Sequence, residues 1–342
     1  MISLIVLYII SYLIFIFPFD VLLSWLGKHT SLLEVLLSTT IVFIFCLYYF
    51  RSKSTNKIIK IFVYEGFGVG TVSFFLILPL MLVNYFQILI ETQLVIIFFS
   101  IQIPVIFYGY INSKKLKIKK LLLNSSLINK SINFIFISDV HIGSNHPSSL
   151  KKLVSKINEL DFSFLIIGGD LIDSSAFKIH DLNELKKINK PIFFVTGNHE
   201  YYLHNYKKHL QDFNTVGIQI LDNESLTVDG INIIGLSDNI SNKSKIDYVQ
   251  TLSKKEMFNL LIVHKPSIWK KVSKNVNLML SGHTHNGQIF PFNYIVKLKF
   301  PENYGLYKNI DNYLYVSSGS ATWGPKIRIG SNNEIIHIKI KN

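Results

Sequence analysis

Four long apolar stretches occupy the first third of the chain. Each is close to the ~20 helical residues needed to cross about 30 Å of hydrocarbon. They run over Ile2–Phe19, Leu32–Phe50, Ile61–Phe86 and Leu94–Tyr110. The first stretch lacks the basic start and small-residue cleavage site of a signal peptide, and three more stretches follow it. The pattern predicts a transmembrane region of about four helices over residues 1–112.

A second pattern begins at residue 133, where short apolar runs end abruptly in polar turns. Runs of this length that are rich in Ile, Phe and Val are typical of buried strands. Five of them cover Phe134–Ile137, Phe164–Ile167, Ile192–Val195, Leu260–Val263 and Leu278–Leu280. Apolar residues at helical spacing over 150–160 predict an amphipathic helix after the first strand, and β-like alternation returns over 313–316 and 335–340. Together these elements predict a sheet-centred α/β sandwich.

Basic residues fall on one side of the predicted spans. Arg51, Lys53, Lys57 and Lys60 lie between the second and third spans, and five lysines follow the fourth span within residues 114–120. By the positive-inside rule, both ends of a multi-pass protein of the inner or plasma membrane, and its C-terminal domain, are expected in the cytoplasm. We interpret residues 113–132 as a basic juxtamembrane linker lying near anionic headgroups, and residues 133–342 as one soluble domain.

Composition supports this division. The chain is 49% hydrophobic and its mean hydropathy is +0.32, which is too apolar for an ordinary soluble domain. Of 22 acidic and 35 basic residues, only four and five fall within residues 1–112. The net charge of +13 fits nucleic acid, anionic lipid or a phosphorylated substrate. For a chain with membrane spans we favour lipid and expect no nucleic-acid partner. A single cysteine, Cys46, excludes an intrachain disulfide framework and a zinc–cysteine site.

Polar clusters follow each of the five predicted strands. In α/β folds the ligand site lies beyond the carboxyl ends of the strands, and these clusters all fall there. They supply seven oxygen or nitrogen ligands and no sulfur: Asp139, His141, Asp170, Asn198, His264, His283 and His285. Seven such ligands suit two divalent cations that share a carboxylate and leave room for water and substrate. We expect the pair Asp139 and His141 to lie on an extended segment with both side chains on one face, and likewise His283 and His285.

These motifs resemble the five sequence blocks of the calcineurin-like metallophosphoesterases. The blocks are Asp139-x-His141, Gly169-Asp170-x-x-Asp173, Gly197-Asn198-His199-Glu200, an isolated His264, and Gly282-His283-x-His285, in the family's order. Further similarity in 287–288, 304–307 and 317–334 points to the bacterial membrane-anchored YkuE/YaeI-type branch. The resemblance implies an α/β domain with two β-sheets flanked by helices. One departure is Asn286, where relatives have glycine; Asn tolerates a positive φ, so we expect little damage.

The resemblance also implies a role for each residue. One cation would be held by Asp139, His141 and His285, the other by Asn198, His264 and His283, with Asp170 bridging the two. His199 would be the general acid or a transition-state stabiliser near the leaving group. Asp173 and Glu200 would orient ligand imidazoles by hydrogen bonds. The metals could be Mn, Fe, Zn or Co, since the ligand set does not choose among them.

The sequence therefore predicts a membrane-anchored hydrolase of a phosphodiester, pyrophosphate or phosphomonoester bond. An active site beside a bilayer suggests a lipid-linked substrate. The alternative from a different class is a non-catalytic membrane sensor or scaffold that binds a phosphorylated ligand. A transporter is poorly supported, because the four spans carry few internal charges. A nuclease fits the net charge but not the membrane tether.

Overall fold

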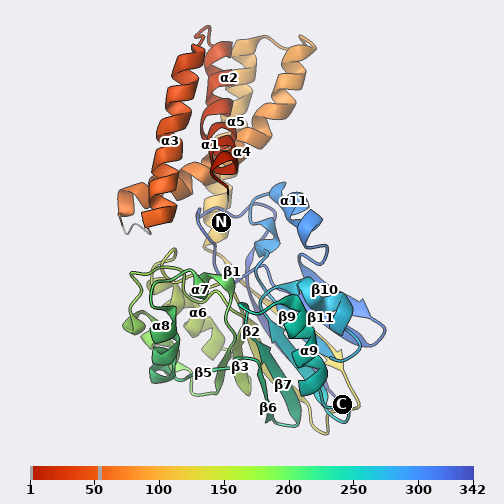
Figure 1. Cartoon of the computed structure of the whole chain (residues 1–342). Coiled ribbons are helices and arrows are strands. Elements are labelled where there is room, and N and C mark those ends of the chain that lie inside the picture. The colour runs from red at the N-terminus through yellow and green to blue at the C-terminus, as the bar shows by residue number, and fades with distance from the viewer. Residues whose placement is uncertain (1–2, 53–55) are drawn as a thin grey trace. The chain divides into compact units, whose positions relative to one another are not determined.

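The computed structural model describes residues 3–52 and 56–342 (Figure 1). Ile2 and Lys53, which entered the predictions above, lie outside the described residues. The chain forms two compact units. The first contains residues 1–112 together with Gly324–Ile329, and the second contains Ser113–Trp323 together with Gly330–Asn342.

The first unit is helical. Its elements are α1 (Leu4–Ser11), the π-helical turn η1 (Tyr12–Ile16), α2 (Phe17–Trp25), α3 (Leu32–Ser52), α4 (Lys57–Tyr85) and α5 (Glu91–Ser113). They provide four helices long and apolar enough to cross a membrane: Leu4–Trp25, Leu32–Arg51, Ile58–Tyr85 and Glu91–Ser113. The number of spans agrees with the sequence prediction. Pro18 does not end the first span, because it occupies the first turn of α2, where its missing N–H costs little.

A six-residue excursion from the second half of the chain belongs to this helical unit. Glycines on α4 and α5 make room for the segment Gly324–Ile329: a Cβ on Gly68 would lie 2.6 Å from Cβ of Pro325, and one on Gly109 would lie 2.7 Å from Ile327. The Arg328 backbone N–H donates to the Gly109 carbonyl at 3.0 Å. Arg328 is fully buried, and the segment is therefore part of the helical packing.

The second unit contains two six-stranded sheets. The first has the order β1-β12-β2-β3-β4-β5, built from Leu116–Asn124, Asn333–Lys341, Ile132–Ile137, Phe164–Ile167, Ile192–Phe194 and Ile218–Ile220. The second has the order β10-β11-β9-β8-β7-β6, built from Gly305–Asn309, Asn312–Val316, Leu278–Ser281, Phe258–Val263, Ile231–Leu236 and Glu224–Val228. The strands β2 to β5 run parallel to one another, as do β7, β8, β9 and β11.

Three apolar clusters hold the sheets and helices together. The central cluster fills the space between the two sheets and includes Phe134, Phe164 and Leu260, all fully buried. A second cluster packs α6 (Ser148–Asn158), η2 (Ile179–Lys187) and η3 (Phe213–Val216) on the first sheet. A third packs α9 (Asn242–Leu252) and α10 (Trp269–Val272) on the second sheet. The predicted α/β sandwich with helices outside two sheets is the observed fold.

Residues 113–132 are not a linker. Nine of these twenty residues form β1, which pairs in parallel with β12 from Leu116 beside Asn333 to Asn124 beside Lys341. Lysines alternate with apolar residues there, so the segment reads as basic although Leu121 and Leu123 are buried. The fourth apolar helix thus ends at Ser113, and the first strand begins three residues later.

Candidate metal centre

All seven predicted ligands lie beyond the carboxyl ends of neighbouring strands. Asp139 and His141 follow β2, Asp170 follows β3, and Asn198 begins the short helix α7 (Asn198–Tyr201) after β4. His264 follows β8, while His283 and His285 follow β9. Parallel strands end at one edge of a sheet, so side chains far apart in the sequence meet there.

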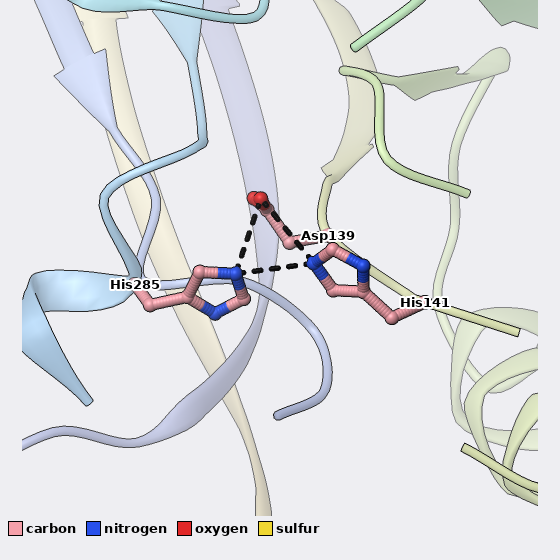
Figure 2. A group of neighbouring side chains, drawn as sticks. All are labelled: Asp139, His141 and His285. Atoms are coloured by element: carbon pink, nitrogen blue, oxygen red, sulfur yellow. Dashed lines mark hydrogen bonds and ion pairs between the residues drawn. The ribbon is translucent and has the colours of Figure 1, made fainter. Parts of the chain in front are cut away.

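The first group comprises Asp139, His141 and His285 (Figure 2). The two Nε2 atoms of His141 and His285 are 3.1 Å apart. The Asp139 Oδ1 lies 3.4 Å from the His285 Nε2 and 3.9 Å from the His141 Nε2. Asp139 and His141 are fully buried, and the His285 side chain is 11% exposed. Three potential ligand atoms thus converge on one point from two sheets.

The second group comprises Asp170, His264 and His283. The Asp170 Oδ2 lies 3.1 Å from the His264 Nε2. It is also 3.9 Å from the His141 Nε2, so this carboxylate lies between the two groups. The His264 Nδ1 donates to the Gly168 carbonyl at 2.8 Å, which turns its other nitrogen toward the centre. The His264 and His283 rings pack edge to face, with their centroids 5.1 Å apart.

Backbone geometry at the site differs from the expectation. Asp139 and His141 were expected on an extended segment, but both have a positive φ, at 55° and 50°. His283 and His285 do too, at 73° and 50°. The side chains therefore converge because the chain turns back at each ligand, and not because of strand alternation. Sparsely populated backbone conformations of this kind are typical of functional sites. Asn286 also has a positive φ, at 50°, as its position required.

Two glycines beside the ligands allow the ligand carboxylates to lie close to the backbone, because glycine has no side chain. A Cβ on Gly282 would overlap the Asp139 Oδ2 and lie 2.6 Å from the Ser138 Oγ. A Cβ on Gly197 would likewise overlap the Asp170 Oδ1. The Gly282 backbone is not left-handed, so what Gly282 contributes to the site is the absence of a side chain.

At the centre, burial and neighbouring charges shift the pKa values of His264 and Asp170 in opposite directions. Burial lowers the pKa of His264, but the carboxylates of Asp170 and Asp139 outweigh it and raise that pKa to about 10. Burial raises the pKa of Asp170, but the imidazoles of His264 and His199 hold it well below its usual value. For His283, burial and the nearby His264 both lower the pKa. The carboxylates thus favour a positive charge at this position, whether a proton or a metal cation.

The two residues expected to orient imidazoles behave differently. The Asp173 Oδ2 lies 3.3 Å from the His141 Nδ1, and its Oδ1 accepts from the Ser144 N–H at 2.6 Å. Glu200 does not contact an imidazole in this way. Its carboxylate accepts four backbone N–H groups at 2.7–3.1 Å, from Gly197, Asp170, Leu171 and Ile172. Glu200 therefore holds the two loops that carry Asp170 and Asn198, which corrects the expected role.

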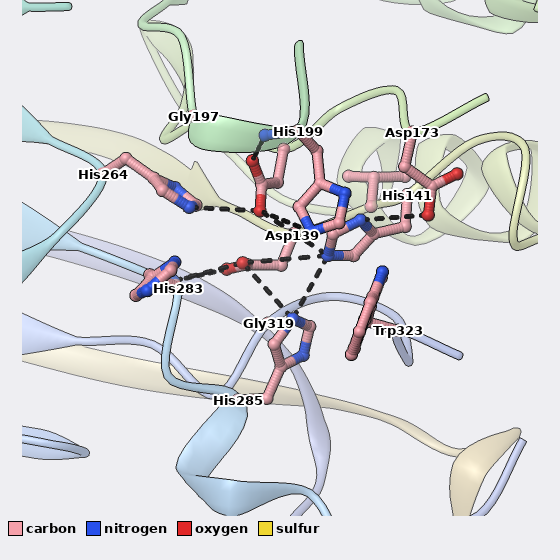
Figure 3. Close-up of polar contacts among 12 residues, drawn as sticks. Asp139, His141, Asp173, Gly197, His199, His264, His283, His285, Gly319 and Trp323 are labelled. Carbon is pink, nitrogen blue, oxygen red and sulfur yellow. Dashed lines mark hydrogen bonds and ion pairs between the residues drawn. The ribbon is translucent and has the colours of Figure 1, made fainter. Parts of the chain in front are cut away.

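His199 lies beside His141 at the centre (Figure 3). Its side chain is 17% exposed, and its Nε2 is 3.9 Å from the Asp170 Oδ2. Its ring packs against His141 at 4.8 Å and against Trp323 at 5.5 Å. The sequence analysis did not place Trp323 at the site. The signal was weak, because Trp323 follows no strand directly and precedes a Gly-Pro pair that reads as a simple turn.

The donors present fit metal ions. The Asn198 Oδ1 is buried and has no hydrogen-bond partner among the described residues. A buried amide oxygen without a partner is costly unless something else binds it. This oxygen is therefore a candidate donor beside the imidazoles and carboxylates of the two groups, which are oxygen and nitrogen ligands suited to Mn, Fe, Zn or Co.

Comparison with known proteins agrees with this geometry. The profile of the family described as calcineurin-like phosphoesterase matches residues 132–287. An uncharacterized metallophosphoesterase of Helicobacter pylori is 35% identical over 237 residues, covering 66% of this chain and 64% of the relative. A zebrafish "transmembrane protein with metallophosphoesterase domain" is 30% identical over 232 residues, covering 61% and 53%. The metallophosphoesterase YkoQ of Bacillus subtilis is 28% identical over 256 residues, covering 68% and 93%.

The chain spans less than two thirds of the length of the Helicobacter and zebrafish relatives. The matched region contains β2 to β9 and every predicted ligand. The YkuE/YaeI-type branch is not tested by these matches and stays a prediction. Four apolar helices and a relative named as a transmembrane protein mark the chain as a membrane protein. Within the second unit, residues 132–287 form a calcineurin-like phosphoesterase domain.

Proposed function

We propose that the chain is a membrane-anchored phosphoesterase with a dinuclear metal centre, hydrolysing a phosphodiester, pyrophosphate or phosphomonoester bond. The observation that supports the proposal is that the Asp170 Oδ2 lies 3.1 Å from the His264 Nε2 of one ligand group and 3.9 Å from the His141 Nε2 of the other. Asp139, His141 and His285 would hold one cation. Asn198, His264 and His283 would hold the other, and Asp170, which lies between the groups, would bridge them. When bound, two divalent cations acidify water and neutralise phosphoryl oxygens.

The chain's own residues would do the rest. His199 is the group best placed to move a proton, because its Nε2 lies 3.9 Å from the Asp170 Oδ2 and its side chain reaches solvent. Burial lowers its pKa, so its protonated form is the stronger acid toward a departing oxygen. Trp323 packs on the His199 ring and limits its rotation. Glu200 keeps the Asp170 and Asn198 loops together from behind.

The substrate and location follow as parts of the same proposal. Four apolar helices hold the domain at a bilayer, which favours a phosphorylated, lipid-linked substrate over a nucleic acid. The basic connections favour an inner or plasma membrane protein whose catalytic domain faces the cytoplasm. Reporter fusions at Asn342 that are active only outside the cytoplasm would contradict this orientation.

The test uses the full-length protein purified with Mn²⁺. We expect hydrolysis of bis-p-nitrophenyl phosphate or p-nitrophenyl phosphate. His199→Ala should lower the rate by about 10²–10⁴-fold and leave bound metal unchanged, whereas Asp170→Asn should lose metal. Full metal content without hydrolysis of either ester or of a lipid pyrophosphate would refute the enzyme and favour a sensor that binds a phosphorylated ligand.

A further inference from the structure

Helix α11 (Phe292–Lys299) carries exposed apolar side chains. Leu298, Tyr294 and Ile295 are 85%, 62% and 48% exposed, and none of the eight residues of this helix is buried. Tyr294 and Ile295 lie one turn before Leu298, so the three share a face. Phe290, just before the helix, is 52% exposed and its ring contacts Tyr294 at 5.9 Å. A contiguous apolar surface of this kind marks an interaction site.

The charges around α11 indicate which class of partner its apolar surface binds. From Gly287 to Pro301 the chain contains Lys297 and Lys299 and no acidic residue. Both lysines lie in the last turn of α11. Aromatic and aliphatic side chains combined with lysine on a short helix are typical of helices that lie in the headgroup region of anionic membranes.

The segment that contains α11 leaves the metal centre and returns to it. It follows the turn η5 (His285–Gly287), which contains a predicted ligand. After its last residue, Phe300 returns to pack its ring against His283 at 5.2 Å. Whatever α11 binds is therefore held close to the phosphoesterase site.

Strand register shows which edge of the domain meets the membrane tether. The fourth apolar helix ends at Ser113, and β1 begins at Leu116. Leu116 pairs with Asn333 at the start of β12. β12 is antiparallel to β2, and Ile336 near its start pairs with Phe136 near the end of β2. The chain thus enters the domain at the edge where β2 ends and the ligands begin.

We propose that α11 is an interfacial helix that inserts its apolar face into the headgroup region of an anionic phospholipid bilayer. The chain enters the domain at this edge directly after a helix long and apolar enough to cross a bilayer, and the two lysines of α11 bind anionic headgroups. The interaction holds the mouth of the metal centre at the membrane surface. This surface contact does not depend on whether the centre is catalytic.

The test labels single cysteines in the full-length protein in liposomes. Cys46, the one native cysteine, is buried, so the unmodified protein is the labelling blank. Leu298→Cys carries an environment-sensitive fluorophore on α11. Ile310→Cys is the matched control: Ile310 is 76% exposed and lies in the β10–β11 turn, at the opposite edge of its sheet. The liposomes contain phosphatidylglycerol and a lipid with a nitroxide near the start of the acyl chain.

A probe about 5–10 Å deep in the interface should be quenched severalfold by this lipid. We expect that quenching at position 298 and little at 310. Adding Lys297→Glu and Lys299→Glu, or replacing phosphatidylglycerol by neutral lipid, should reduce it. Equal quenching at both positions, or none at 298, would overturn the proposal. A shielded but unquenched probe at 298 would also overturn it, because a protein partner or second copy would then cover α11.

Discussion

Replacing Gly282 with alanine is expected to remove metal from the centre without touching a ligand side chain. The new Cβ would overlap the Asp139 Oδ2 and lie 2.6 Å from the Ser138 Oγ, whereas ordinary van der Waals contact begins at 3.4 Å. The glycine cannot retreat easily, because its N–H donates to the His264 carbonyl at 2.9 Å. Asp139 is also fixed, since its carboxylate accepts from the His283 N–H at 3.1 Å.

The strain therefore falls on the Asp139 carboxylate. Overpacking of this size costs about 1–3 kcal/mol of folding stability. Loss of the partners of a metal site lowers affinity by about 10–100-fold, and displacing a ligand should cost at least that much. We expect Gly282→Ala to fold with a modestly lower melting temperature. Elemental analysis of the purified protein should find its bound metal reduced, together with its phosphoesterase rate.

Gly217→Ala provides the control. No heavy atom lies within 4 Å of a Cβ at Gly217, but its φ of 81° strains any other residue. This change should cost about 1–2 kcal/mol of backbone strain and leave the metal content unchanged. If Gly282→Ala retained wild-type metal, the close approach at Asp139 would not be what shapes the centre, and the reasoning would be wrong.

Three further outcomes are expected. Asp173→Asn should weaken metal binding by about tenfold or more, because the His141 Nδ1 loses its anionic neighbour at 3.3 Å. Calorimetric titration with Mn²⁺ measures this affinity, and an unchanged value would contradict the role of Asp173 as the partner of His141. Glu334→Gln should reduce the free energy of unfolding by about 1.5–3 kcal/mol, because the buried Glu334 carboxylate accepts a hydrogen bond from the Tyr315 hydroxyl at 3.1 Å. A denaturant titration that showed no measurable change in this free energy would contradict the prediction. The His264 pKa is about 10, so below that pH a proton on His264 competes with the metal and the apparent metal affinity should rise with pH. A metal affinity that stayed constant between pH 6 and 8 would refute this competition.

The sequence was most informative where strong local patterns coincide. Short apolar runs ending in Asp139, Asp170 and His264 located three strands and their ligands, because a buried strand must be apolar and its end can carry polar groups. The same logic failed for β6 and β7, which the sequence analysis did not predict. Residues of β6 are half-buried or exposed, so no clear run of buried residues marks that strand.

Other features depend on contacts distant in sequence. Glu200 follows His199 and suggested an imidazole partner, but its acceptor atoms face backbone N–H groups from another loop. Arg328 carries a charge, yet it is fully buried and belongs to the helical unit. Neither arrangement has a local signal. Spacing predicts which side chains leave one strand end, and it does not reveal which distant backbone they meet.

The excursion Gly324–Ile329 limits how freely evolution can rearrange this molecule. A catalytic module fused to an anchor by one peptide bond could be transplanted onto another anchor. Here the polypeptide threads back, and the six residues Gly324–Ile329 complete the packing of the helices within residues 1–112. Glycines at positions 68 and 109 are matched to that insertion. Recombination that exchanged only one of these two segments would separate Pro325 and Ile327 from the glycines that make room for them, so residues 1–112 and Gly324–Ile329 are expected to be inherited together.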